Sequence, residues 1–112
     1  MRLESLQEGS VMVVRILESR IDIRDTADFK AAMAVHIDKG YKRIVLEFSE
    51  VDFIDSSGLG AIVSILKRLG DEGELAISGA KPTVLNLFKM TRLDRIFTIV
   101  ATEEDAVRAL SS

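Results

Sequence analysis

The chain has 112 residues, 47% of them hydrophobic and 29% charged, which is enough for one core of ordinary domain size and leaves little room for a second domain. Its formal net charge of −3 argues against nucleic-acid binding, which usually needs a basic surface, and against a polybasic membrane anchor. Cysteine is absent and histidine occurs once, so the sequence excludes disulfides, thiol catalysis, and cysteine-based or histidine-rich metal sites.

The amino terminus and the most apolar stretch of the chain bear on location. Residues 1–5 include charged side chains and lack the apolar segment of a signal peptide. Residues 59–66 are the most apolar stretch, but they are interrupted by Gly60 and Ser64 and fall far short of the about 20 residues that span a bilayer. We therefore expect a cytoplasmic protein that does not insert into membranes.

The first half of the chain alternates between strand and helix patterns. Residues 11–17 are β-branched and apolar and predict a strand, and Ile21 and Ile23 on either side of Asp22 predict a second, short strand. A helix follows through about residue 39, capped by Asp25 or Thr26 and ended by Gly40. Its apolar positions share one face, which comprises Phe29, Ala32, Met33, His36 and Ile37.

The second half repeats the alternation. Residues 43–48 have the nearly continuous apolar centre of a covered parallel strand, and residues 51–55 lead into a helix that stops at Gly70. Residues 75–77 predict the next strand, and Pro82 suits the first turn of the next helix. Residues 96–100 predict a final strand, after which Thr102 caps the last helix.

This order of elements predicts an α/β fold in one domain, residues 1–112. We expect a mixed, mostly parallel sheet of about four to five strands with four helices, joined by right-handed crossovers. The two leading strands, residues 11–17 and 21–23, are expected to form an antiparallel addition at one edge.

The junction of residues 55–60, Asp-Ser-Ser-Gly-Leu-Gly, follows a strand and opens a helix, where ligand sites tend to lie in open α/β folds. Ser56 has two available roles there. As a helix cap its hydroxyl would contribute about 1 kcal/mol. As a phosphate acceptor it would place an anion at a helix N-terminus, which favours negative charge. The local sequence favours the cap.

The helix after this junction is more apolar than a surface helix needs to be. The excess indicates either deep burial or a docked partner. Gly60 and Ser64 lie one turn apart, and their small size would let the backbone of a partner come close. Burial and docking both remain open from the periodicity.

Residues 51–60, Val-Asp-Phe-Ile-Asp-Ser-Ser-Gly-Leu-Gly, closely resemble the signature of the STAS domains of anti-sigma-factor antagonists. The resemblance continues around Ile21-Asp22, although the glycine often found before that segment is replaced, and through residues 82–97. It implies that Ser56 is the phosphorylated residue, with Ser57 as the alternative. It also implies a partner-binding surface that comprises Asp22, Asp55, Ser57, Gly58, Leu59, Gly60 and Ser64.

The resemblance further implies a partner-switching function. The unmodified protein would bind an anti-sigma factor that is also a serine kinase and so free its target. A phosphate on Ser56, close to Asp52 and Asp55, would weaken that binding by like-charge repulsion. A phosphatase would reverse the modification, and ATP would enter only as the phosphate donor of the kinase. The alternative is a stand-alone STAS subunit of a lipid-transport ABC system.

Catalytic interpretations of the same residues are weaker. Asp52 and Asp55 are expected to be solvated loop acids rather than a metal site or an acid–base pair. The glycines lack the lysine of a phosphate-binding loop, and Ser64 does not match a nucleophile elbow. The lone histidine, His36, falls on the predicted buried face of its helix. We therefore expect no catalytic residue, metal or cofactor.

Overall fold

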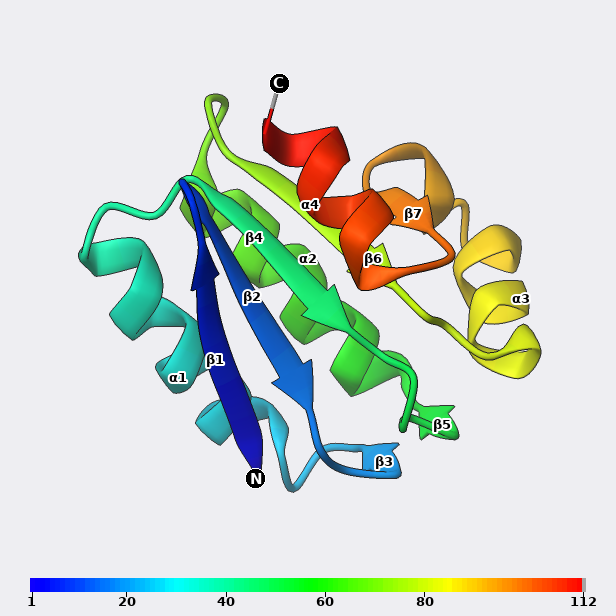
Figure 1. Ribbon diagram of the computed structural model, residues 1–112. Coiled ribbons are helices and arrows are strands. Elements are labelled where there is room, and N and C mark those ends of the chain that lie inside the picture. Colours follow the sequence, from blue (N-terminus) through cyan, green and yellow to red (C-terminus); the bar gives the residue numbers. More distant parts are fainter. Residues whose placement is uncertain (112) are drawn as a thin grey trace.

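The computed structural model describes residues 1–111 as a five-stranded sheet with helices on both faces (Figure 1). The strands lie in the order β1 (Leu3–Glu8), β2 (Val11–Ile16), β4 (Arg43–Glu47), β6 (Glu74–Ser78) and β7 (Thr98–Val100). The β1 strand is antiparallel to β2, and every other pair is parallel. Two short strands, β3 (Arg20–Ile21) and β5 (Phe53–Ile54), pair in parallel beside this sheet.

Four α-helices connect or follow these strands within residues 1–111. They are α1 (Thr26–Asp38), α2 (Ser56–Leu69), α3 (Pro82–Met90) and α4 (Glu103–Ser111), and a 3-10 turn, η1 (Leu93–Arg95), precedes β7. Figure 1 shows α1 and α2 behind the sheet, α4 in front of it and α3 beside the β6–β7 edge. The predicted α/β class, the mixed sheet and the four helices are confirmed.

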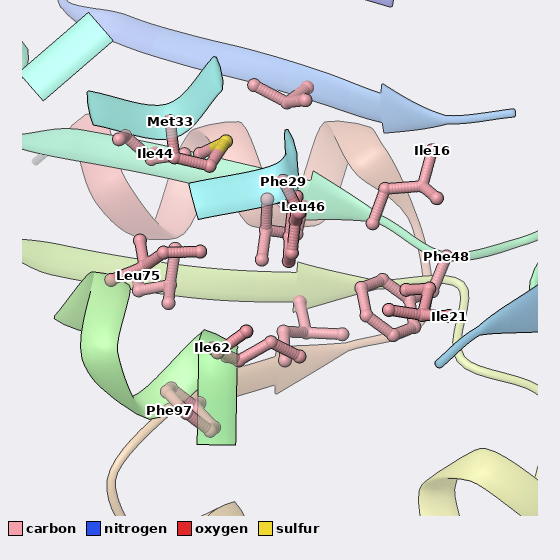
Figure 2. Packing of buried hydrophobic residues seen from close by; sticks show 14 of the residues in the cluster. Ile16, Ile21, Phe29, Met33, Ile44, Leu46, Phe48, Ile62, Leu75 and Phe97 are labelled. Carbon is pink, nitrogen blue, oxygen red and sulfur yellow. The ribbon is translucent and has the colours of Figure 1, made fainter. Parts of the chain in front are cut away.

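The core lies on both faces of the sheet, which explains why successive residues in the central strands are apolar, as in residues 11–14 of β2 and 44–46 of β4. In β2, Met12, Val14 and Ile16 belong to the larger cluster, which packs against α1 and α2. Figure 2 shows this cluster, with Phe29 and Met33 of α1 and Ile62 of α2 among its members. The alternate residues Val11, Val13, Val45 and Ala76 form the second cluster with Ala106 and Leu110 of α4.

The predicted arrangement at the edge of the sheet is wrong in its pairing. The antiparallel neighbour of β2 is β1, whereas β3 pairs in parallel with β5. The sequence does not predict β1 because the strand is exposed after Leu3 and its two leucines, Leu3 and Leu6, lie three residues apart, so it has no apolar alternation. Gly9, with φ of 61°, makes the tight turn between β1 and β2.

The predicted final strand also begins too early. Leu93–Arg95 form the η1 turn, entered through Arg92 at φ of 62°, and the strand begins at Thr98. Phe97 is buried against the ring of Phe88, with 6.1 Å between the ring centres, so its apolar character serves the core and not a strand.

His36 is only partly buried on α1, whose buried residues are Phe29 and Met33. Its Nε2 lies 3.1 Å from the Ser5 hydroxyl of β1, and burial lowers the pKa of the ring. The single histidine therefore links α1 to the edge strand of the sheet.

Candidate functional site

The junction between β5 and α2 is built around Asp55, which is the N-cap of α2. Its carboxylate accepts hydrogen bonds from the Ser57 hydroxyl at 2.5 Å and from the Gly58 backbone amide at 2.9 Å. The bond from Ser57 is the main cause of a lowered Asp55 pKa, and the bond from Gly58 adds to it. Asp55 is therefore ionised at neutral pH and holds the first turn of α2.

The favoured interpretation of Ser56 as the helix cap is wrong. The cap is Asp55, whose extended backbone, with φ of −96° and ψ of −177°, has the conformation typical of that position, while Ser56 is already the first helical residue. The Asp55 carboxylate thus accepts the hydrogen bond from the Gly58 amide that the Ser56 hydroxyl would have accepted as a cap. The Ser56 side chain is exposed, and within residues 1–111 its hydroxyl makes no hydrogen bond.

Ser57, the alternative acceptor, is in a different situation. It is half-buried, and its hydroxyl donates to Asp55. Modification of Ser57 would break this bond and place a second anion against an ionised carboxylate. The geometry therefore favours Ser56 over Ser57 as the accessible hydroxyl.

Gly58 and Leu59, both expected at the partner surface, are buried. A Cβ on Gly58 would lie 2.6 Å from Cγ1 of Ile54 and 3.1 Å from the carbonyl oxygen of Ile21. Only glycine lets α2 start this close to β3 and β5. Any influence of Gly58 on a partner would therefore act through the position of the turn and not through direct contact.

Gly60 and Ser64 are exposed on α2. A Cβ on Gly60 would meet no atom within 4 Å, so the surface there is open. The apolar residues of the same helix mostly point inward, namely Leu59, Ala61, Ile62, Ile65 and Leu69. Deep burial thus accounts for most of the apolar excess, and Gly60 and Ser64 form the small-residue stripe that remains outside.

Asp22 lies at the end of β3, beside this junction. It is 8% exposed, and its carboxylate accepts from Nη2 of Arg24 at 2.9 Å and from the Arg24 backbone amide at 3.0 Å. These bonds lower the pKa of Asp22. The Asp55 backbone amide donates to the Ile21 carbonyl at 3.2 Å, so the ends of β3 and β5 bring Asp22 and Asp55 to one edge of the molecule.

A groove of about 370 Å³ separates this junction from α3 and was not foreseen in the sequence. We term it the α2–α3 groove. Asp52 lies on one side of it and forms an ion pair with Lys81, the residue that precedes α3. The groove is lined by Asp52, Phe53, Ile54, Asp55, Ser56, Leu59, Thr83, Val84, Leu87 and Thr91.

Phe53 of β5 is an aromatic residue of the same groove that the core does not cover. It is 40% exposed, and the guanidinium of Arg20 lies 4.3 Å from its ring centre. The β5 strand has only two residues, so one side chain must face outward. An exposed aromatic residue therefore stands next to Ser56.

Within residues 1–111, no group of three histidine or acidic side chains is arranged to hold a metal ion. No helix there has the length and apolar character needed to cross a bilayer.

Comparison with known proteins places these features in a family. The model of the STAS domain matches residues 2–106. The anti-sigma F factor antagonist of Paenibacillus polymyxa is 30% identical over 116 residues, covering 98% of this chain and 95% of that protein. BtrV of Bordetella bronchiseptica is 28% identical over 102 residues, covering 90% of this chain and 88% of BtrV.

Solved structures show the same fold. The anti-sigma factor antagonist from Mycobacterium paratuberculosis superposes with a TM-score of 0.90 at 22% identity, covering 99% of this chain and 94% of that one. The antagonist SpoIIAA in its unphosphorylated form superposes with a TM-score of 0.82 at 23% identity, covering 98% and 96% of the two chains. The family model spans almost the whole chain, and the Paenibacillus relative matches nearly all of it. The chain therefore belongs to the STAS domain family.

Proposed function

We propose that this protein is an anti-sigma factor antagonist that works by partner switching in the cytoplasm and is not itself an enzyme. Its unmodified form binds an anti-sigma factor that is also a serine kinase, and phosphorylation at Ser56 releases it. One observation carries the proposal: the Ser56 hydroxyl is exposed at the first position of α2 and free of hydrogen bonds within residues 1–111, because Asp55 occupies the cap. The name of the Paenibacillus relative supports the same function.

The proposed chemistry at Ser56 is a simple phosphoryl transfer carried out by the partner. The Ser56 oxygen forms a bond to the γ-phosphorus of ATP, the bond from that phosphorus to ADP breaks, and the hydroxyl proton leaves to a base of the kinase. A phosphatase reverses the modification by adding water across the Ser56 oxygen–phosphorus bond. This chain supplies the acceptor and its presentation, and the nucleotide belongs to the kinase.

The charges around Ser56 explain why the modification would release a partner. A phosphoserine adds about −1.5 to −2 charges at pH 7. Asp55 directly precedes Ser56 and is ionised, and Asp52 lines the same groove. A partner that packs on Gly60, Ser64 and the exposed part of Phe53 would have to desolvate this enlarged negative cluster.

The test compares tagged variants of this protein as baits in a pull-down from source-cell lysate. The affinity of each variant for the captured kinase is then measured by calorimetry. We expect wild type and Ser56→Ala to retain a small ATP-binding kinase, and Ser56→Asp to bind it at least about tenfold more weakly. Ser10→Asp is the matched control, because it adds the same charge at an exposed serine of the β1–β2 turn, outside the α2–α3 groove, and should bind as wild type does.

Equal affinities of Ser56→Ala and Ser56→Asp for the kinase would contradict the proposal. Capture of the ATPase of a lipid transporter by both baits would instead support the alternative of a transporter subunit. That result would be consistent with the STAS fold but would contradict the proposed signalling role.

A further inference from the structure

We propose that Lys81 changes its partner when Ser56 is phosphorylated, so that its ammonium group leaves Asp52 and binds the phosphate at the α2–α3 groove. The inference rests on the proposed function, since it assumes that Ser56 is the modified residue. It adds a second residue to the switch and a defined change in the pairing of charges around it.

The ion pair between Lys81 and Asp52 lies at the α2–α3 groove. The Nζ atom of Lys81 contacts Oδ1 of Asp52, which joins the residue before α3 to the loop before β5. Asp52 and Ser56 both line this groove. The lysine is therefore held at the groove into which a phosphate on Ser56 would be introduced.

Both members of this pair are free to separate. The side chain of Lys81 is 41% exposed and that of Asp52 is 62% exposed. Pairs this open to water contribute little to stability, and a carboxylate released from one is rehydrated at once. Loss of the pair would therefore cost little.

Two cations on the β3 side of the junction, Arg20 and Arg24, are already engaged within the described part of the chain. Arg24 binds Asp22 through its side chain and its backbone amide, and the guanidinium of Arg20 lies over the ring of Phe53. The lining of the groove contains Asp52 and Asp55 and no basic residue. Lys81 is thus a cation that the structure already holds on an acid of this lining, where an anion on Ser56 would compete for it.

Charge decides the direction of the exchange. A phosphoserine carries close to twice the charge of a carboxylate at pH 7, and lysine binds phosphate well as a compact point charge. The group formed by Lys81, Asp52 and Ser56 would change from neutral to about −1.5 to −2. A partner would then face two altered features, a phosphate held by Lys81 and an unpaired Asp52.

The experiment titrates a phosphate placed at Ser56 by genetically encoded phosphoserine, followed by phosphorus NMR. The second pKa of a phosphoserine is about 6, and a bound ammonium lowers it. We expect Lys81→Met to raise this pKa by about 0.2 to 0.7, the size typical of an exposed ion pair. Lys89→Met is the matched control and should leave the pKa unchanged, because Lys89 lines a separate hollow with Asp94 and Ile99.

A second variant, Asp52→Asn, tests whether Lys81 exchanges one anion for another or only lies near the phosphate. Asp52→Asn removes the competitor, so Lys81→Met should raise the phosphate pKa more in the Asp52→Asn background than in the wild-type background. An unchanged pKa in Lys81→Met, or an equal rise in Lys89→Met, would overturn the proposal.

These outcomes are independent of the proposed function, because the phosphate is installed without the kinase. If the titration shows the exchange but the phosphorylated protein still binds its kinase, the fault lies in the proposed function. If phosphorylation releases the kinase but the titration shows no role for Lys81, the fault lies in this inference alone.

Discussion

Two glycines near the start of α2 show how differently a single residue type is used. Gly58 is buried, and a Cβ would lie 2.6 Å from Ile54. Gly60, two positions later, is exposed, and a Cβ there would meet nothing within 4 Å. The fold therefore requires glycine at position 58, whereas at position 60 it would accept a larger side chain.

Replacement of each glycine by alanine should give opposite results. Gly58→Ala forces α2 away from β3 and β5 and should lower the free energy of unfolding by about 1 to 3 kcal/mol. Gly60→Ala, its matched control, lies inside a helix with free space and should raise stability by about 0.5 to 1 kcal/mol. Urea denaturation measures both changes. Equal stabilities of the two variants would mean that the approach of α2 to Ile54 is not tight.

At the scale of elements, a bidentate contact between Arg15 and Glu103 joins α4 to the sheet in addition to the small apolar face of the helix. Its buried residues are Ala106 and Leu110. In its first turn, Glu103 accepts from Nε of Arg15 at 2.8 Å and from Nη2 of Arg15 at 2.9 Å. Arg15 also binds Glu4 of β1 at 2.7 Å, so one guanidinium of β2 joins the edge strand to the last helix.

Loss of the Glu103 carboxylate should destabilise the protein in a pH-dependent way. The bond from Arg15 lowers the pKa of Glu103 in the folded state, so its contribution is present above the unfolded pKa near 4.5 and is lost as pH falls through the folded value. Because Arg15 and Glu103 are 35% and 25% exposed, we expect Glu103→Gln to cost about 0.5 to 1 kcal/mol at pH 7 and almost nothing near pH 3.

Glu104→Gln is the control for this measurement, since Glu104 is exposed in the same turn. It should leave the denaturation midpoint unchanged at both pH values. A cost of Glu103→Gln that persists at pH 3 would show that packing, and not the ion pair, is responsible.

At the scale of the whole molecule, the exposed stripe of Gly60 and Ser64 lies beside the accessible Ser56 hydroxyl, at one end of the sheet. We expect Gly60→Gln to weaken kinase binding by at least about tenfold, because a long side chain would fill the open surface, while the melting temperature stays close to that of wild type. Calorimetric titration with the captured kinase measures the affinity, and thermal denaturation measures the melting temperature.

A matched control for this variant lies on the neighbouring helix. Ala31→Gln adds the same side chain to an exposed small residue of α1 and should leave binding unchanged. Unaltered kinase affinity in Gly60→Gln would remove α2 from the interface and would leave the proposed phosphorylation of Ser56 untouched.

Sequence alone was sufficient for the class of the fold and for most of its elements. The apolar pattern of residues 11–16 and 43–47 is local, and so is the pattern of glycines that end α1 and α2. The junction motif at Ser56 is likewise contiguous, which is why it could be recognised in the chain itself. β1 was not predicted because an exposed strand whose two leucines are three residues apart has no such pattern.

The tertiary structure decided which of these residues meet. Pairing of β3 with β5, and of β1 with β2, is set by contacts between segments that no local pattern links. The cap at Asp55 rather than Ser56 depends on the backbone angle at which β5 enters α2. Lys81 and Asp52 are 29 residues apart, and only the packing of α3 against the β5–α2 junction brings them together. The sequence by itself therefore determined the helices and strands, because their patterns are local. The α2–α3 groove and the ion pair beside it depend on packing between distant segments, which a local pattern does not contain.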